Sequence, residues 1–535
     1  MALVMTTAMF VVTGAQAPSP PARSPQAQSA AQVEFRRGLD WLHSFMYEDA
    51  IDAFRAAQKL DPNFAMAYWG EAMSFSQPLW FFEEPEKGRA ALAKLGATPA
   101  ARIAKAKTPR EQGFLRAVEA LFGAGDAAAR LAAQAKEMAR VAADNPADDD
   151  AQTFYALALL ATLPRGDAAL PIRQQAGAIA ERVFARNPKH PGAAHYILHA
   201  YDHGSLAAKA LPAARAYAKI APQASHALHM PAHAFLQVGF WDEAAATDEA
   251  SWNASIAWAK RRGLPITSRD YHSLTWLQYE WTQQGRFSKT KDAIAFVNEA
   301  MKAPGPKTQD PRPQHAGGHG YGESEIGRGS NEAALRNDRG SMRARYIVES
   351  ERWGEMKGQS SFDNIEELFA LGLSAVNLGD AARVRVVIDE LRKASAPSQP
   401  VELREQAEIM LREMEALDLF AQGRHAEAFA AMDRAAALQG RMPRPIGRPF
   451  PVKDVNELYG ELLLQVNRAK EAITWFDRSL ARTPNRSRGL LGLARAYRNA
   501  GDGANARAAY KRFLTNYRLA DPGLAEITEA KEALK

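Results

Sequence analysis

Two pairs of histidines in the middle of the chain have the residue type and the spacing of metal ligands. His195 and His199 lie in the segment HPGAAHYILHAYDH, and His229 and His233 lie in SHALHMPAHAF. Residues four apart on a helix share one face, so each pair can chelate one ion. The second pair follows the first at an offset of 34 residues, which indicates equivalent positions of a structural repeat.

The composition narrows the choice of cofactor. The chain contains no cysteine, which excludes thiolate ligands, thiolate nucleophiles and disulfides. Imidazole is a ligand for zinc, copper, iron and nickel, and we expect a divalent transition metal of this group. With three protein ligands, the ion would keep a coordination position open for an activated water. Two alternatives stay open: histidines that donate hydrogen bonds to a carboxylate ligand without metal, and histidines that only pack.

The elements that position these residues are helices, because the sequence follows helical periodicity from Val33 onward and has no strand-like run. The first unit resembles the tetratricopeptide (TPR) repeat, and the same period returns in tandem near the C-terminus. The matching positions are Gly38, Trp41, Ala50, Phe54, Ala57 and Pro62, then Gly460, Leu463, Ala472, Phe476 and Pro484, then Ala494, Tyr497, Ala506 and Tyr510. The resemblance implies an all-α, TPR-like α-solenoid, a superhelix of antiparallel helix pairs.

In TPR arrays the first helix of each pair lines a concave surface, with positions 2, 5, 9 and 13 facing it. We take Pro191, Ser225 and Tyr271 as the first positions of three central units. The resemblance then implies that seven histidines face the groove, and we predict them as the metal ligands: His195, His199, His203, His226, His229, His233 and His272.

Other polar and aromatic side chains are expected to face a small ligand in the same groove. These substrate or groove residues are Trp69, Glu71, Tyr196, Asp270 and Tyr271. Trp69 and Glu71 belong to a first helix that we predict over residues 65–80. Asp202 and Asp270 lie beside the histidines in sequence and are candidates to bind the ion or to orient its ligands.

The chain divides into helical blocks separated by segments that lack apolar periodicity. His315 and His319 lie in a Gly-rich segment, where Gly317 and Gly318 argue against a helix. The expected organisation is a signal peptide (1–17), a disordered linker (18–32), N-terminal and degenerate repeats (33–163), central His-rich repeats (164–304), a Gly-rich loop (305–340), further repeats (341–440), a linker (441–451) and C-terminal repeats (452–535).

The N-terminus predicts export to the periplasm or the extracellular space. An apolar stretch from Ala2 to Gly14 precedes Ala15-Gln16-Ala17, the small-residue pattern of a signal-peptide cleavage site. No later run is long enough for a transmembrane span. The net charge of +6 is spread over the chain without a basic block, so we expect no nucleic-acid partner.

The central motifs resemble a group of exported bacterial TPR proteins with an HPGAxHYxxHA segment followed by an HxxHMPxH segment. The matching residues are His190, His195, His199, His226, His229, Met230, Pro231 and His233, together with the helices that contain Met66 to Ala72 and Met342 to Tyr346. Gln77 departs from the histidine that is frequent there in the group. The resemblance implies the fold and the export of the protein, and it does not indicate which activity the protein has.

The sequence therefore favours an exported TPR scaffold or binding protein with a His-rich metal site on its concave face. A metal-dependent enzyme, hydrolytic or oxidative, is the first alternative, and a metal-free peptide-binding adaptor is the second. The expected partners are a small molecule or peptide in the groove, with protein partners as a further option.

Overall fold

The computed structural model describes residues 29–80, 82–164, 166–303 and 331–535. Within these residues the chain is an all-α, TPR-like solenoid of 25 α-helices, and the only sheet is a two-stranded pair of short strands. The predicted signal peptide and most of the predicted linker lie outside the described residues, as do His315 and His319.

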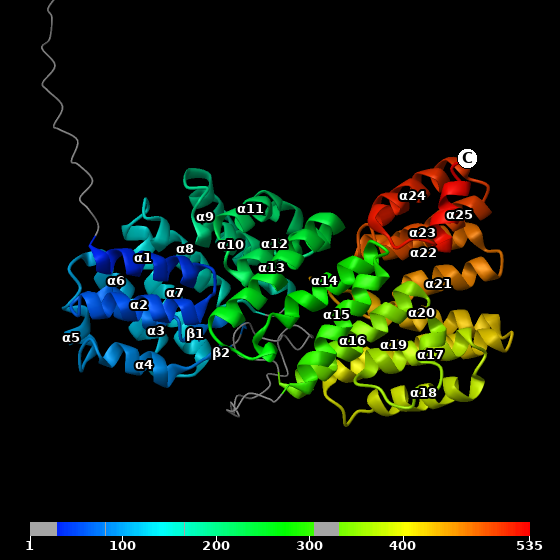
Figure 1. Cartoon of the computed structure of the whole chain (residues 1–535), viewed down its shortest axis with the longest axis horizontal. Coiled ribbons are helices and arrows are strands. Elements are labelled where there is room, and N and C mark those ends of the chain that lie inside the picture. Colours follow the sequence, from blue (N-terminus) through cyan, green and yellow to red (C-terminus); the bar gives the residue numbers. More distant parts are fainter. Residues whose placement is uncertain (1–28, 81, 165, 304–330) are drawn as a thin grey trace, which may run out of the picture.

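Consecutive helices pack as antiparallel pairs, and the pairs follow one another along the long axis of the molecule (Figure 1). The N-terminal helices are α1 (Ala30–His43), α2 (Tyr47–Leu60), α3 (Ala65–Met73), α4 (Pro85–Ala93), α5 (Pro99–Ile103), α6 (Pro109–Leu121), α7 (Ala127–Asp144), α8 (Asp149–Leu160) and α9 (Leu170–Arg186). The central helices are α10 (Pro191–Ala200), α11 (Ala207–Ile220), α12 (Ser225–Val238), α13 (Trp241–Arg261), α14 (Tyr271–Gln283), α15 (Phe287–Lys302) and α16 (Glu332–Ser350).

The C-terminal helices continue the same alternation to the end of the chain (Figure 1). They are α17 (Ile365–Asn377), α18 (Ala381–Ala394), α19 (Val401–Ala421), α20 (His425–Arg441), α21 (Val455–Gln465), α22 (Ala469–Arg482), α23 (Ser487–Asn499), α24 (Gly503–Asn516) and α25 (Ala525–Glu532). No helix in the described part of the chain is both long and apolar enough to cross a membrane.

The repeat positions do the packing that the TPR resemblance implies. Phe54 of α2 fills the space between α1 and α3, because a Cβ on Gly38 or Gly70 would come within 2.6 or 2.4 Å of its ring. Phe476 plays the same role near the C-terminus, where Gly460 and Gly492 leave room for it. The predicted first positions are also confirmed, since α10, α12 and α14 begin at Pro191, Ser225 and Tyr271.

Three predicted boundaries are corrected by the structure. The helix expected over residues 65–80 ends at Met73, because Pro78 cannot continue a helix and restricts the residue before it. The strands β1 (Ser76–Gln77) and β2 (Phe82–Glu83) follow, with Ser76 opposite Glu83. The predicted linker ends early, because Ser29 caps α1, and residues 332–340 of the predicted Gly-rich loop are helical because Asn331 caps α16.

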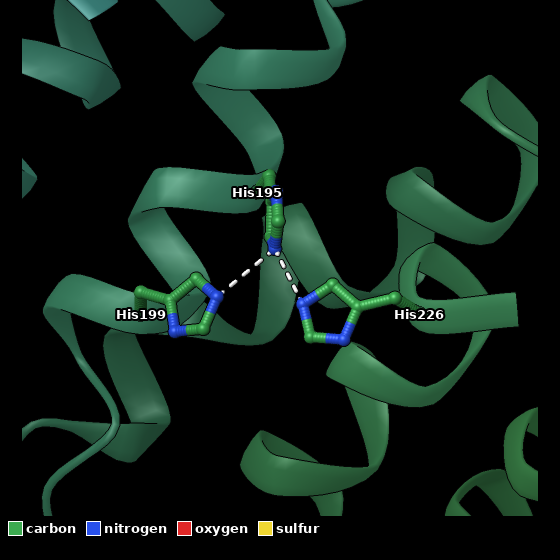
Figure 2. A group of neighbouring side chains, drawn as sticks. All are labelled: His195, His199 and His226. Atoms are coloured by element: carbon green, nitrogen blue, oxygen red, sulfur yellow. Dashed lines mark hydrogen bonds between the residues drawn. The ribbon is translucent and has the colours of Figure 1, made fainter. Parts of the chain in front are cut away.

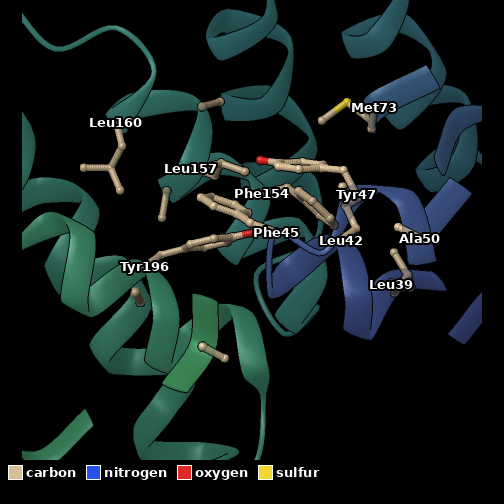
Figure 3. Close-up of a cluster of buried hydrophobic side chains, with 14 of the residues drawn as sticks. Leu39, Leu42, Phe45, Tyr47, Ala50, Met73, Phe154, Leu157, Leu160 and Tyr196 are labelled. Carbon is tan, nitrogen blue, oxygen red and sulfur yellow. The ribbon is translucent and has the colours of Figure 1, made fainter. Parts of the chain in front are cut away.

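The superhelix is tight enough for repeats far apart in sequence to touch. The core of the N-terminal half gathers side chains from α1, α2, α3, α8 and α10, including Tyr196, together with Phe45 from the turn between α1 and α2 (Figure 3). On the other side, the Trp241 indole donates to the Asn485 carbonyl at 2.8 Å. The central repeats therefore contact both the N-terminal and the C-terminal repeats.

Candidate metal centre

Three histidines from two neighbouring helices converge on one point (Figure 2). His195 and His199 come from α10, and His226 comes from α12. The Nε2 atom of His195 lies 3.0 Å from Nε2 of His199 and 3.0 Å from Nε2 of His226. We call these three residues the first triad.

Hydrogen bonding fixes the tautomer of His195. Its Nδ1 atom lies 2.6 Å from the carbonyl oxygen of His43. A carbonyl only accepts, so Nδ1 carries the proton and the Nε2 of a neutral ring presents a lone pair. Burial lowers the pKa of His195 to about 3 and the pKa of His199 and His226 well below the ordinary value, so all three rings are neutral at pH 7.

An aromatic wall covers the first triad. The ring centroid of Phe45 lies 4.3 Å from that of His195 and 5.4 Å from those of His199 and His226. Trp80 lies in the turn between β1 and β2. Its ring packs edge-on against the ring of His226, with the two centroids 5.1 Å apart. These contacts exclude water from one side of the rings.

A second group repeats the arrangement one unit further along the chain. His229 and His233 come from α12 and His272 from α14, and one ligand atom from each lies within 4.8 Å of the others. The Nε2 atoms of His229 and His233 lie 3.0 Å apart. We call these three residues the second triad.

Two carboxyl groups contact the Nδ1 atoms of the second triad, on the side of the rings opposite the Nε2 atoms. Nδ1 of His229 lies 2.6 Å from Oδ1 of Asp248, and Nδ1 of His233 lies 3.0 Å from Oδ2 of Asp202. If both carboxyls are ionised, both Nδ1 atoms donate and the two Nε2 lone pairs face each other, which is repulsive unless a cation lies between them. Imidazole nitrogens backed by carboxylates are a recurring feature of protein metal sites.

The protonation state of Asp248 decides whether the second triad presents two lone pairs to each other. Burial, and next the charge of Glu280, raise the pKa of Asp248 well above its ordinary value, and burial raises the pKa of Glu280 to about 8. In the part of the chain that the structure describes, neither carboxyl forms an ion pair with lysine or arginine. Without a metal ion, a protonated Asp248 donates to Nδ1 of His229, so that His229 carries its own proton on Nε2 and donates it to Nε2 of His233. A metal ion between the two Nε2 atoms would replace that proton.

A third group, His43, Asp150 and His190, is built differently. Nδ1 of His190 accepts from the Ala193 amide, so its Nε2 carries a proton and donates to Oδ1 of Asp150 at 3.3 Å. His43 reaches the same oxygen at 3.3 Å. Burial alone would raise the pKa of Asp150, but these hydrogen bonds hold it well below its ordinary value. The protons of this group are all accounted for, so we assign it a role in packing.

The seventh predicted ligand and the predicted groove residues have other contacts. His203 lies in the loop after α10, outside both triads, and its Nδ1 lies 2.9 Å from the Ser205 hydroxyl. The predicted groove residues are buried and contact the interior of the fold. Trp69 packs on Phe114 and Phe154, and Glu71 accepts from Arg55, Gln58 and Lys94. The hydroxyl of Tyr196 hydrogen-bonds to His43, Asp270 caps α14, and Tyr271 donates to the Ile266 carbonyl.

The inner rings of the triads are closed to solvent, because His195 is 0% exposed and His229 is 1% exposed, whereas His199 and His272 are partly exposed. A peptide lying on the surface could contact only the partly exposed rings of His199 and His272. Sequence reasoning missed two groups that complete the site, Phe45 and Asp248. Phe45 stands in a turn, and Asp248 lies on the second helix of its repeat, where the TPR pattern has no position that faces the groove.

Comparisons with known proteins add little to this geometry. No protein-family profile and no curated protein matches the sequence. Among solved structures, the human IFIT1 dimer with m7Gppp-AAAA is 12% identical with a TM-score of 0.34, over 92% of this chain and 95% of that chain. The APC/C hetero-tetramer Cut9–Hcn1 is 10% identical with a TM-score of 0.28, over 95% and 97%.

The P58(IPK) TPR domain is 14% identical with a TM-score of 0.21, over 95% of this chain and 98% of that chain. Similarity at this level carries no inference about ligand or partner. The fold assignment rests on the helix pairs and on the Phe54 and Phe476 contacts described above.

Proposed function

We propose that the chain is an exported TPR-type binding protein that holds divalent transition-metal ions at the two triads. The observation that carries the proposal is the 3.0 Å separation between Nε2 of His229 and Nε2 of His233, while both Nδ1 atoms face carboxyl groups. An ion between the two nitrogens would take the place of the proton on Asp248 and remove the repulsion between the lone pairs that loss of this proton leaves.

The donor set fits zinc, copper, iron or nickel. Each triad offers three imidazole nitrogens, and a tetrahedral ion with bonds of 2.0–2.1 Å would hold its ligand nitrogens about 3.3 Å apart. The observed separations of 3.0 Å are close to that value. All three ligand atoms of each triad lie within 4.8 Å of one another, so rotations of the rings can bring them onto one ion.

Metal analysis of protein purified without a histidine tag tests the proposal. We expect up to two equivalents of one transition metal, a loss of metal in His195→Ala and in His229→Ala, and a lower melting temperature after chelation. His425→Ala is the matched control, because His425 is exposed on α20. If the metal-free protein retains none of Zn²⁺, Cu²⁺, Fe²⁺ and Ni²⁺ after incubation with each ion, the proposal is rejected.

A metal-dependent enzyme is the second candidate. Three protein ligands are typical of catalytic sites, which keep a fourth position for water or substrate. The aromatic wall of Phe45 and Trp80 beside the first triad favours an apolar substrate there. Co²⁺ bound at the first triad, in protein with His233→Ala to disable the second, would separate the candidates. A bound water exchanges with added anions and changes the visible spectrum, whereas a closed four-coordinate site is inert.

Export is supported by the leader-like N-terminal sequence and by the resemblance to exported TPR proteins. The full chain, expressed in a Gram-negative host with a C-terminal epitope tag, is expected in the periplasmic fraction in a shortened form. Retention of the full-length chain in the cytosol would contradict the assignment.

A further inference from the structure

The C-terminus of α1 ends at the first triad. Its last residue is His43, and the carbonyl oxygen of His43 lies 2.6 Å from Nδ1 of His195. The last carbonyls of a helix have no partner within the helix, and they form the negative end of its dipole. The end of α1 therefore gives Nδ1 of His195 an acceptor with a partial negative charge.

The turn that follows α1 brings Phe45 onto the same histidines. The φ angle of Phe45 is 57°, in the left-handed region that bulky residues rarely adopt. Such a conformation is unfavourable and persists only where the surrounding structure holds it. The ring of Phe45 packs on all three imidazoles of the first triad. The end of α1 therefore places both the acceptor of His195 and the aromatic ring that covers the triad.

The side chain of His43 is held at both of its nitrogens. Its Nε2 atom lies 3.3 Å from Oδ1 of Asp150 on α8, and its Nδ1 atom lies 3.0 Å from the hydroxyl of Tyr196 on α10. Burial lowers the pKa of His43 to about 4, so the ring is neutral at pH 7. Asp150 is ionised and can only accept. Nε2 of His43 therefore carries the proton, and Nδ1 accepts from the Tyr196 hydroxyl.

Packing further restricts the ring of His43. The ring stacks on Phe154, with the two centroids 4.5 Å apart. A Cβ added at Gly192, in the first turn of α10, would come within 2.3 Å of its Nδ1. The side chain of His43 thus joins α1 to α8 and α10. Because the ring is fixed, the carbonyl of the same residue is also fixed, at the point where α1 no longer holds it.

We propose that His43 is the positioning residue of the first triad. Its side chain directs its carbonyl at Nδ1 of His195, which keeps the Nε2 lone pair of His195 available to a metal ion, and it anchors the turn that places Phe45. This inference rests on the proposed metal site, and it adds a function to the packing of the group His43, Asp150 and His190. The tautomer of His195 is a property of the metal-free protein and can be measured without the ion.

The first measurement is the tautomer of His195 in the metal-free, full-length protein. In ¹⁵N spectra of histidine-labelled protein, the protonated and the unprotonated nitrogen of a neutral ring have well-separated chemical shifts. The signals of His195 are identified by their loss in His195→Ala. We expect the proton on Nδ1 in the parent protein. His43→Phe keeps an aromatic ring against Phe154 but loses both hydrogen bonds, so it should shift part of the population to the Nε2–H tautomer.

The second measurement is the affinity of each triad for Co²⁺, followed by visible absorption. His233→Ala isolates the first triad, and His199→Ala isolates the second. His43→Phe should weaken Co²⁺ binding at the first triad by about tenfold or more, the usual effect of removing a group that orients a ligand. It should leave the affinity of the second triad unchanged.

Two further variants and a control complete the series. His43→Gln can still donate to Asp150 and should retain part of the affinity of the first triad. Tyr196→Phe removes one hydroxyl from the hydrogen bonds of His43, so it should act in the same direction as His43→Phe with a smaller effect, and it replaces that variant if His43→Phe does not fold. His425→Phe, exposed on α20, is the matched control.

An unchanged tautomer of His195, or an unchanged affinity of the first triad, in folded His43→Phe would overturn the inference while leaving the metal site in place. Equal weakening of both triads would also overturn it, because a general loss of stability has that effect. If the parent protein binds no Co²⁺ at either triad, the proposed function is rejected, and the tautomer of His195 alone then decides whether His43 positions it.

Discussion

His195 and His229 occupy equivalent positions of successive repeats, yet their Nδ1 atoms meet different acceptors. Nδ1 of His195 lies 2.6 Å from a neutral backbone carbonyl, whereas Nδ1 of His229 lies 2.6 Å from the carboxyl of Asp248. A carboxylate behind an imidazole increases its basicity as a metal ligand. The second triad therefore offers a divalent ion a more negative environment than the first.

We predict that the two sites fill in order, the second triad before the first. Titration of metal-free protein with Zn²⁺ in a calorimeter should show a tight phase and a weaker phase. His233→Ala should remove the tight phase, and its repeat equivalent His199→Ala should remove the weaker one. The substitutions delete the same atoms from the same repeat position, so each serves as the control for the other. The reverse assignment, or two equal phases, would contradict the prediction.

Asp248→Asn should weaken the tight phase by about 10–100-fold, the usual effect of removing a carboxylate behind a ligand. The amide oxygen can still accept from Nδ1 of His229, so ring orientation is preserved while the charge is lost. Affinity of the weaker phase should not change. Glu243→Gln, exposed on the same helix, is the control for loss of a negative charge on α13. An effect of equal size in that control would show that general charge, rather than the contact with His229, sets the affinity.

The TPR packing makes a separate prediction about stability. Gly492→Ala would place a methyl group 2.1 Å from the ring of Phe476, and Gly70→Ala would place one 2.4 Å from the ring of Phe54. Each ring must shift within a packed core, which costs about 1–3 kcal/mol of unfolding free energy.

Gly440→Ala is the matched control, because nothing lies within 4 Å of its added Cβ on α20. It should stabilise the protein by about 0.5–1 kcal/mol through helix propensity. Urea denaturation followed by circular dichroism measures all three variants. Equal stability of Gly70→Ala and the parent protein would show that the ring of Phe54 is not tightly held.

Local patterns in the sequence predict the helices and a large part of the candidate site. The first positions of α10 and α12, Pro191 and Ser225, are 34 residues apart, whereas the start of α14 at Tyr271 is marked by its cap Asp270. Two members of each triad follow from helical spacing alone. His272 lies 46 residues after His226, off the period, because α13 has 21 residues and a further turn precedes α14.

Contacts between distant repeats could not be predicted in this way. Phe45 reaches the histidines because the superhelix is tight, and no single-repeat pattern encodes its pitch. Asp248 and Glu280 are buried carboxyls on different helices, and among 61 acidic residues nothing in their spacing distinguishes them. The burial of the triads, which the resemblance to an open TPR groove did not suggest, follows from the same tertiary contacts.

A buried carboxyl outside the triads gives a pH-dependent prediction. Glu413 of α19 is 0% exposed, and neither of its carboxyl oxygens has a hydrogen-bond partner in the described residues. Burial, and next the charge of Asp454, raise its pKa well above the ordinary value. The folded state therefore holds a proton that the unfolded chain releases once the pH rises above about 4.5.

Stability contributed by protonated Glu413 is present in full below pH 4.5 and declines as the pH rises toward the folded pKa, because the unfolded state then binds fewer protons. Glu413→Gln keeps the shape of the protonated acid and cannot ionise. Relative to the parent, the variant should therefore gain stability with increasing pH, by up to about 1.4 kcal/mol per pH unit, and should be close to the parent at pH 4.

Melting temperatures between pH 4 and 8 measure this difference, and titrations common to both proteins cancel from it. Glu405→Gln, exposed on the same helix, should show no such slope. A stability difference between Glu413→Gln and the parent that stays constant across this range would mean that Glu413 ionises in the folded protein as readily as in the unfolded chain.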